Sequence, residues 1–536
     1  MKAGKEILAA CVNLEGTISG EHGIGLEKQD SMPLMFSPAE LELMHRVKDF
    51  FDPEEILNPG KITPLEKIKP IEVTDNRVIS TSTPEKDKLL YDELVEILGK
   101  DKVMADSHKL AEYQVDEKLP HLAVFPANTE HVCEVIRTVN LHAMTLILWG
   151  NGSKQAIGPP LTEMGTVLSL KNMHRLLELD TPNLTARVEA GMNHAELQKE
   201  LAKHGLLFPL EPADIESATI GGSLATNSNG PKRLLYGTTR DLVLGITAVT
   251  PTGEVIRIGG KTMKNVAGYD LRKLFLGSWG TLGVITDAIL RLFYLPEEHK
   301  TMLLKFQNIG SLSQIVRQIS NSFLRPESME LIDAIATQWL NSLNTFKLQE
   351  NELLLLIGLA GTTEVVNRHI TEIQTLAAAN NNKIVAILND TEENEIWDNQ
   401  RYIQRSLPYP ESGTIKGKAV VPSHRMRDMY QDIQQATIRH GLQVGITGHA
   451  GNGILYPTLF SKNHDTQHNE MLALVAELIQ SANKLGGFFL VESGPPEIRQ
   501  AYDIVSQRSD YGLMKRLKQT LDPQNILNPG KVIRNL

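Results

Sequence analysis

Two glycine-rich stretches dominate the middle of the chain: PLEPADIESATIGGSLATNSNG at 209–230 and KNVAGYDLRKLFLGSWGTLGVIT at 264–286. Glycine has no Cβ atom, so a backbone that carries it can approach another group closely and turn its N–H groups toward an anion. The pair Gly221-Gly222 and the turn 280–283 suit such an approach. Each glycine taken singly predicts only a turn in a β-rich domain. So many at these spacings favour a cofactor that carries a diphosphate.

A hairpin is predicted between the two stretches. The segments LVLGITAVT at 242–250 and EVIRI at 254–258 are typical of strands, and PTG at 251–253 is a turn signal. The glycine turn at 280–283 leads into a β-branched run that starts at Val284, which predicts one more strand.

The first glycine loop in chain order lies upstream, in LWGNGSKQAIG at 148–158, after an apolar run that ends like a strand. It is not the dinucleotide fingerprint GxGxxG, which would need a glycine at Gln155, and Pro159 and Pro160 exclude a following helix. A strand that ends in Gly-x-Gly-Ser still offers successive N–H donors and a hydroxyl to a pyrophosphate. Alone, this loop is a weak signal.

Together the two loops resemble the flavin domain of the vanillyl-alcohol oxidase/p-cresol methylhydroxylase type, and most closely the small flavin subunit of bacterial glycolate oxidase. The segments that carry the resemblance are WGNGSKQAIG, ATIGGSLATNSNGP, TTRDLVLGITAVTPTGEVIRIGG, KNVAGYDLRKLFLGSWGTLGVIT and GHAGNG. The resemblance extends from Pro120 to the C-terminus. It implies an α+β fold in which FAD lies across two subdomains, followed by a cap domain with an antiparallel sheet and helices.

The resemblance also implies which residues hold FAD. Relatives with covalent flavin often carry a histidine in the first glycine loop, where this chain reads GNGS, so we expect noncovalent FAD. Tyr269 is expected on or near the flavin, with a core aromatic as the alternative. The residues expected to bind FAD are Gly150, Asn151, Gly152, Ser153, Gly158, Gly221, Gly222, Gly268, Tyr269, Gly280, Thr281, Gly283, Val284 and Ile285.

Composition narrows the remaining possibilities. The chain has 536 residues, of which 41% are hydrophobic and 22% charged, ordinary values for a globular protein. Its net charge of −10 argues against nucleic acid as a partner. Only Cys11 and Cys133 are present, which excludes a disulfide framework and a four-cysteine iron–sulfur cluster and suits a reducing compartment. The longest apolar run, 353–359, is too short to span a bilayer.

The two ends of the chain contain an internal repeat. DPEEILNPGKI at 52–62 and DPQNILNPGKV at 522–532 share eight of eleven positions, and GTISGEHGIG upstream of the first aligns with GFFLVESGPP upstream of the second. The first copy resembles the end of the large, catalytic flavin subunit of glycolate oxidase and of its D-lactate dehydrogenase relatives. The second resembles the end of the small subunit. We hypothesise that residues 1–64 are a large-subunit tail fused to a small subunit, either naturally or as an artefact of gene prediction.

Four regions are expected: this tail at 1–64, a linker and helix at 65–119, an FAD-binding domain at 120–295, and an FAD-linked oxidase C-terminal (cap) domain at 296–536. In the tail, Ser37 is a predicted N-cap with Glu40 three residues on. In the FAD-binding domain, Thr129 and Asn193 are predicted helix caps. The cap domain is predicted to place its helices on one face of its sheet.

The catalytic chemistry is expected in the cap. In catalytic relatives two histidines and a glutamate bind a divalent ion that holds the hydroxy acid, and a neighbouring histidine takes the hydroxyl proton. By resemblance, His449 matches the first ligand and Glu492 the third, whereas Tyr456 stands at the second and Ser493 at the base. We therefore expect a degraded site and no bound metal. Turn or structural roles for His449 and Glu492 stay open.

Two further residues are candidates for the same site. His22, in the tail, is a possible catalytic residue, because it follows Glu21 as the base follows the glutamate in those relatives. Arg401, after Trp397, resembles a substrate-binding arginine of relatives, but a solvated helix face is the stronger interpretation.

These observations lead to two functional hypotheses. The first is an FAD-dependent subunit of a glycolate oxidase-type complex, which oxidises glycolate or D-lactate and passes electrons to an iron–sulfur subunit beside a large flavin subunit. The second is an FAD-binding electron-transfer or scaffold subunit without its own catalytic site. A self-sufficient D-lactate dehydrogenase is a third class, which Tyr456 and Ser493 argue against. We expect a cytoplasmic location, with attachment to the inner face of the membrane only through partners.

Overall fold

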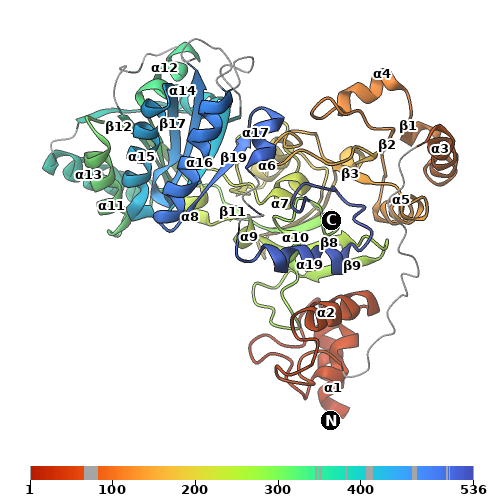
Figure 1. Cartoon of the computed structure of the whole chain (residues 1–536). Coiled ribbons are helices and arrows are strands. Elements are labelled where there is room, and N and C mark those ends of the chain that lie inside the picture. The colour runs from red at the N-terminus through yellow and green to blue at the C-terminus, as the bar shows by residue number, and fades with distance from the viewer. Residues whose placement is uncertain are drawn as a thin grey trace.

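The computed structural model describes residues 2–64, 83–343, 348, 353–380, 383–405, 414–461, 468–502, 505 and 508–534. Figure 1 shows two smaller sheet units in the centre and on one side, a large-sheet domain on the other side, and the N-terminal segment (residues 2–64) below them. The linker predicted at the start of 65–119 falls largely on residues 65–82, outside the described residues.

The first sheet unit has the strand order β1-β2-β4-β3, in which β2, β4 and β3 run parallel. Its strands are β1 (Val103–Met104), β2 (Leu122–Val124), β3 (Leu146–Trp149) and β4 (Thr166–Ser169). Helices α3 (Pro84–Leu98) and α5 (Thr129–Leu141) pack against each other beside this sheet. The predicted cap of α5 is wrong by one residue. Asn128 accepts the N–H of His131, because its side chain reaches that donor, while Thr129 bonds Thr286.

The second sheet unit is antiparallel, with the order β5-β6-β10-β8-β9. Its strands are β5 (Leu176–Asp180), β6 (Thr185–Glu189), β8 (Val243–Val249), β9 (Val255–Gly259) and β10 (Val284–Arg291). The predicted hairpin is confirmed as β8 and β9, joined through the 251–253 turn. Helix α6 (His194–Ala202) begins after Asn193, which caps it as predicted, and α7 (Ile220–Thr226) contacts β6 and β10.

The large-sheet domain is one eight-stranded sheet with the order β15-β12-β14-β13-β17-β18-β16-β19, and all of its pairs are antiparallel. Its strands are β12 (Glu298–Phe306), β13 (Ser328–Ile332), β14 (Leu353–Gly361), β15 (Lys383–Ile387), β16 (Ile415–Val420), β17 (Leu442–His449), β18 (Ile454–Ser461) and β19 (Phe488–Ser493). Its helices are α11 (Ile309–Ser320), α12 (Ala334–Leu343), α13 (Thr363–Ala379), α14 (Asp390–Arg405), α15 (Met426–Arg439) and α16 (His468–Lys484).

The expectation that helices cover one face of this sheet is wrong. Helices α11, α13, α15 and α16 share one apolar cluster with one face, whereas α12 and α14 share another with the opposite face. The alternation along β14 shows why: Leu355 and Ile357 pack into the first cluster, and Leu354 and Leu356 into the second. A strand that is apolar on both sides needs cover on both faces.

After the large sheet, the chain returns to the two smaller units (Figure 1). The C-terminal segment (residues 508–534) begins with α19 (Tyr511–Leu521) and continues in an extended stretch. Leu146 of β3 donates its N–H to the carbonyl of Ile526 at 2.7 Å and accepts the N–H of Asn528 at 3.0 Å. The repeat therefore forms a parallel β-bridge with the edge strand of the first sheet.

The N-terminal segment begins with α1 (Lys2–Asn13) and packs below the second sheet unit through α2 (Pro38–Phe51), which contacts β9. The predicted cap of α2 is confirmed as a reciprocal capping box between Ser37 and Glu40. Leu41 and Met44 of α2 belong to the same buried core as both sheet units. The segment thus has no separate core and shares that of its neighbours.

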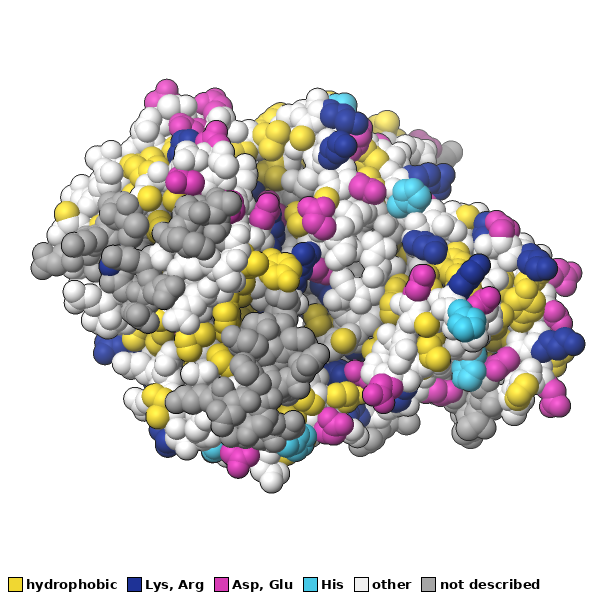
Figure 2. Space-filling view, turned by 90° about the horizontal axis from the view of Figure 1, so that it is seen from above, with side chains coloured by type: hydrophobic (Ala, Val, Ile, Leu, Met, Phe, Trp, Pro, Cys, Tyr) yellow, Lys and Arg dark blue, Asp and Glu magenta, His cyan; other side chains and the backbone are white. Residues whose placement is uncertain are grey.

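The large-sheet domain forms one lobe of the molecule, and the two smaller sheet units form the other. Figure 2 shows both lobes from above, with a hollow between them along which acidic and basic side chains lie. None of the helices in the described part of the chain combines the length and apolar character needed to cross a bilayer.

Candidate flavin and substrate sites

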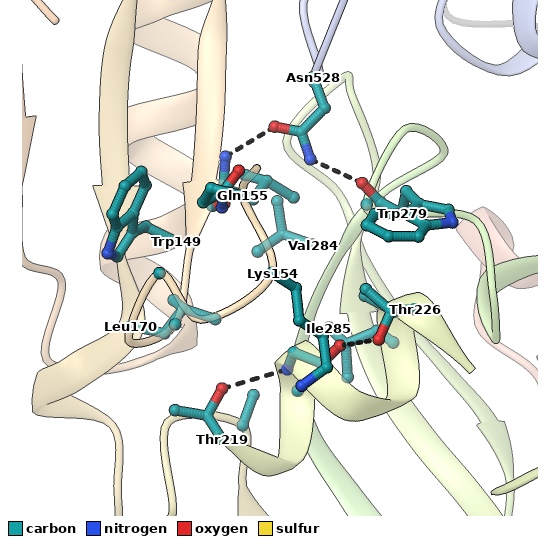
Figure 3. Close-up of a pocket in the computed structure, with 18 of the residues that line it drawn as sticks. Trp149, Lys154, Gln155, Leu170, Thr219, Thr226, Trp279, Val284, Ile285 and Asn528 are labelled. Carbon is teal, nitrogen blue, oxygen red and sulfur yellow. Dashed lines mark hydrogen bonds between the residues drawn. The ribbon is translucent and has the colours of Figure 1, made fainter. Parts of the chain in front are cut away.

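One cleft brings together the two glycine loops and the C-terminal segment (Figure 3). It encloses about 780 Å³ of space between protein atoms, part of which is open to solvent. Of the residues predicted to bind FAD, the lining includes Gly150, Asn151, Gly152, Ser153, Gly221, Gly222, Gly280, Gly283, Val284 and Ile285. Loops separated by more than sixty residues in the sequence therefore meet at one place.

The first loop presents the free donors of the cleft. The backbone N–H groups of residues 150–154 donate to no acceptor within the described part of the chain, although these residues line the cleft. A side chain at Gly150 would place its Cβ 2.3 Å from the Thr219 hydroxyl, and Gly152 has φ +77°. Glycine is thus required at both positions, and the loop offers successive donors to an anion.

The second loop contains Gly221 and Gly222. The prediction that these glycines turn their N–H groups toward a phosphate is wrong. Gly221 donates its N–H to the carbonyl of Ala190 at 2.7 Å, and Gly222 donates to the Thr219 hydroxyl at 3.2 Å. A Cβ at Gly221 would lie 2.7 Å from that of Ala190. The pair therefore lets α7 lie close against β6, and the anion donors come from the first loop.

Two further lining residues, Asn528 and Lys531, come from the C-terminal repeat, and sequence reasoning missed them as site residues. The Asn528 side chain accepts the N–H of Leu148 at 2.9 Å and donates to the carbonyl of Trp279 at 2.6 Å, so it joins the two sheet units across the cleft (Figure 3). The repeat itself was the signal, because an NPGK motif shared by both ends of the chain predicts more than a chance turn.

Lys531 brings a buried cation to the cleft. Its ammonium group donates to the carbonyls of Gln155 and Ile157 at 2.6 and 2.8 Å. Burial, helped by the nearby Arg499, lowers its pKa to about 8. A bound anion would offset this cost of burial, so the position favours a phosphate or another anionic group.

A second lysine lines the same cleft. The Lys154 ammonium lies 3.0 and 2.8 Å from the two carboxylate oxygens of Asp214. Burial alone would raise the pKa of Asp214, but the Lys154 charge and hydrogen bonds outweigh it and lower that pKa. The free N–H groups of the first loop, together with Lys531, therefore fit the diphosphate of FAD.

Four residues predicted to bind FAD lie outside the cleft lining. Gly158 donates to the carbonyl of Glu492 in β19, and the Thr281 carbonyl accepts from Lys518 of α19. Gly268 packs against Met44 of α2, and Tyr269 lines the groove beside the N-terminal segment. Gly158 thus connects the first sheet unit to the large sheet, and the other three lie against the N- or C-terminal segment.

The predicted catalytic residues form part of a polar row across five neighbouring strands of the large sheet. Glu330 of β13 pairs in register with His449 of β17, and its carboxylate lies 2.6 Å from His449 Nδ1. The ring of Tyr456 in β18 is 5.3 Å from that of His449, and the Lys418 ammonium in β16 is 5.6 Å from the Tyr456 ring. Lys418 lies 3.8 Å from Glu492 of β19, which completes the row.

The charges of this row depend strongly on one another. Burial raises the pKa of Glu330, although His449 and Gln400 partly oppose that effect. Burial also raises the pKa of Tyr456, while the charge of Tyr456 is the largest cause of the raised pKa of Lys418. A lysine thus stands beside Tyr456, which by resemblance replaces the second metal ligand of the catalytic relatives.

Arg233 adds a second cation near the row. It begins the short helix α8 (Arg233–Tyr236), which contacts β13, and its charge acts on both Tyr456 and Glu330. Its buried Nε has no hydrogen-bond partner within the described residues. Lys418 and Arg233 together make this part of the cap suitable for a small carboxylate.

The remaining candidates lie elsewhere. His22 is exposed in the N-terminal segment, and the neighbouring Glu21 pairs with Lys264 at 2.5 Å, below the sheet units rather than in the large sheet (Figure 1). Arg401 of α14 pairs with Asp398, as expected of a helix face, but it also lines a polar cavity between the lobes.

Charged residues from both lobes line this polar cavity. His299 of β12 lies 2.9 Å from Glu327 and 2.6 Å from Glu393, and Lys232 pairs with Glu211 at 2.8 Å. Burial alone would lower the pKa of His299, but both carboxylates outweigh it and raise that pKa to about 9. His299 is therefore largely protonated at neutral pH and joins β12 to α14 within the large-sheet domain. The contact across the cavity is made by Lys232, whose ammonium lies 3.6 Å from Glu327.

Comparisons with known proteins agree with this geometry. Residues 120–259 match the family model of the FAD binding domain, and residues 1–62 and 295–532 match that of the FAD linked oxidases, C-terminal domain. The chain is 32% identical to "Glycolate oxidase subunit GlcD" of Bacillus subtilis, over 78% of this chain and 89% of that protein. It is 29% identical to "D-lactate dehydrogenase" of Archaeoglobus fulgidus, over 79% and 96%.

A solved structure shows the same fold. The chain matches p-cresol methylhydroxylase with a TM-score of 0.69 at 17% identity, over 85% of this chain and 98% of that one. The expected α+β fold, with a flavin domain of this type and an antiparallel-sheet cap, is thereby confirmed, and so is FAD as the cofactor. From its fold, its flavin cleft and these matches, the chain belongs to the FAD-linked oxidases.

Proposed function

We propose that this FAD-linked oxidase is a subunit of a glycolate oxidase-type complex that oxidises a small 2-hydroxy acid, glycolate or D-lactate. The observation that carries the proposal is the joint presence of the flavin cleft and the polar row in one chain. The names of the relatives, a glycolate oxidase subunit and D-lactate dehydrogenases, support this substrate class.

In this proposal each residue of the row has a stated task. Bound FAD supplies a two-electron acceptor for the hydride that leaves the hydroxy carbon. Lys418 and Arg233 hold the substrate carboxylate through their positive charges. His449, oriented by Glu330, accepts the hydroxyl proton, and Glu492 keeps Lys418 in position.

A second candidate is an FAD-binding electron-transfer or scaffold subunit without its own chemistry. The contact between Lys418 and Glu492 favours it, because this ion pair, with Tyr456 alongside, fills part of the row with the protein's own charges. In either case we propose a large flavin subunit and an iron–sulfur subunit as partners, and attachment to a membrane only through them.

We further propose that the body of the chain corresponds to the small flavin subunit and that residues 1–64 correspond to a large-subunit tail. The match of residues 1–62 to the C-terminal domain family supports the second statement.

The test is the visible spectrum of the purified full-length protein before and after anaerobic addition of glycolate or D-lactate. Bleaching of the flavin by either acid supports an independent catalytic site, and Lys418→Met should then raise KM more than it lowers kcat. A flavin that stays oxidised with both acids would favour the scaffold subunit.

A further inference from the structure

The two copies of the terminal repeat have the same local structure. Positive φ angles occur at Glu55, Asn58 and Gly60, and at the matching Asn525, Asn528 and Gly530. In the first copy Asp52 accepts the N–H groups of Ile56 and Leu57, both at 2.8 Å. In the second copy Asp522 accepts those of Ile526 and Leu527, at 3.1 and 3.0 Å.

A lysine one helical turn earlier completes each copy in the same way. Lys48 pairs with Asp52 and donates to the carbonyl of Leu57 at 2.8 Å. Lys518 pairs with Asp522 and donates to the carbonyl of Leu527 at 3.0 Å. The first copy is therefore already folded into the form that the second copy uses.

The surroundings of the two copies are opposite. Ile526 and Leu527 are completely buried, and their backbone pairs with β3 at the flavin cleft. Ile56 and Leu57 are 75% and 63% exposed. Asn58 and Lys61, which match the cleft residues Asn528 and Lys531, are also exposed.

The first copy is held in this exposed position by the rest of its segment. Glu40 accepts the N–H of Arg257 in β9 at 2.5 Å, Phe50 stacks under Arg516 of α19, and α2 contacts both β9 and α19. These contacts anchor α2 to the second sheet unit while the loop after it points its apolar side chains to solvent. Ile56 and Leu57, together with Phe51 at 55% exposure, place three large apolar side chains at the surface of one preformed loop and the helix end before it.

We propose that residues 52–62 bind the FAD-binding domain of a second flavin protein of this family, carried on another polypeptide. They would pair with the edge strand that corresponds to β3 and place Asn58 and Lys61 at that protein's flavin cleft. The second copy shows the geometry of this complex within one chain.

A second molecule of this chain cannot bind in this way, because its own residues 522–532 already pair with the edge of its β3. The partner must therefore be a flavin domain with an open edge strand. This inference goes beyond the proposed function, since it requires only that the partner binds flavin and not that this chain oxidises a hydroxy acid.

The first experiment asks whether the sequence of the first copy can take the place of the second copy at the edge of β3. Three substitutions in the full-length protein, Gln524→Glu, Asn525→Glu and Val532→Ile, convert 522–532 into 52–62. We expect the Kd for FAD to rise by less than about fivefold, the cost expected of a small backbone strain at the positive φ of residue 525. Loss of FAD, as in the control Leu527→Asp, would overturn the proposal.

The second experiment measures the interaction itself. The full-length Leu527→Asp variant serves as the receptor for the wild-type protein. Its substitution is expected to displace residues 522–532 from the edge of β3 and so to leave that edge open. Sedimentation velocity of the mixture should show a 1:1 complex, whereas wild type carrying Leu57→Asp should show none. Absence of a complex with a receptor that keeps the wild-type circular dichroism would contradict the proposal. If that receptor unfolds, the FAD affinity of the triple variant in the first experiment decides whether the proposal holds.

Discussion

Residues 52–62 and 522–532 have nearly the same sequence and the same backbone, but only one of them is part of a core. The local hydrogen bonds of Asp52 and Asp522 are equivalent, so they follow from the motif itself. Burial is not equivalent, because the neighbouring chain differs. The comparison shows that a motif can specify its own conformation without specifying what it contacts.

The largest difference between the copies is expected at the aspartates. Asp522→Asn removes the charge that balances the buried Lys518 and weakens the acceptor of two N–H groups. We expect a loss of about 3–5 kcal/mol in the free energy of unfolding, because the lysine stays buried and unpaired. Asp52→Asn should lower the free energy of unfolding by clearly less, because the side chain of Lys48 is more exposed to water than that of Lys518. Urea denaturation measures both, and equal effects would show that both copies are equally buried in solution.

A somewhat smaller difference is expected at the isoleucines. Ile526→Ala empties space in the core and should cost about 2–4 kcal/mol, whereas Ile56→Ala removes only exposed surface and should change stability by less than about 0.5 kcal/mol. Thermal unfolding followed by circular dichroism compares the two. In the presence of the partner proposed above, Ile56→Ala should weaken the complex.

The asparagines test the link between the motif and the cleft. Asn528→Gly keeps the positive φ but removes the bridge from Leu148 to Trp279, so we expect a loss of about 2 kcal/mol and weaker FAD binding. Asn58→Gly should leave both properties unchanged, since glycine adopts the same φ. Fluorescence titration with FAD provides the measurement. A similar loss for Asn58→Gly would mean that the first copy also supports this chain's own flavin site.

The smallest expected effect is on FAD affinity at the lysines. Lys531→Met should raise the Kd for FAD about tenfold, and Lys61→Met should not change it. The pH dependence has a definite sign. Because the pKa of Lys531 is lowered to about 8, the free protein loses this proton as the pH rises through 8, and FAD affinity should fall above that pH. Affinity that stays constant from pH 7 to 9.5 would exclude a charge–charge role for Lys531.

Local signals predicted several elements of the fold. The capping box at Ser37 and Glu40, the hairpin through 251–253 and the cap at Asn193 are short-range patterns, and each is present as predicted. The N-cap of α5 is Asn128, whereas the sequence predicted Thr129. Both adjacent polar residues suit an N-cap, and only the tertiary contact of Thr129 with Thr286 distinguishes their roles.

The flavin cleft was predicted in part. Its glycines are visible in the sequence, because close backbone approach excludes other residues there. The different roles of the loops were not visible, since the N–H groups of Gly221 and Gly222 are taken by Ala190 and Thr219, which only the packing of α7 brings near. The polar row was found in three of its members, whereas Glu330 and Lys418 lie on strands distant in sequence from His449.

By itself, the sequence determined the conformation of both terminal repeats, the positions of the glycine turns and the family of the flavin domain, because each of these depends on residues close together in the chain. Only the tertiary structure decided that Asn528 and Lys531 complete the flavin cleft while Asn58 and Lys61 face solvent. The physical reason is that burial depends on which distant strand edge is available. The edge of β3 can pair with one copy of the motif, and residues 522–532 occupy it.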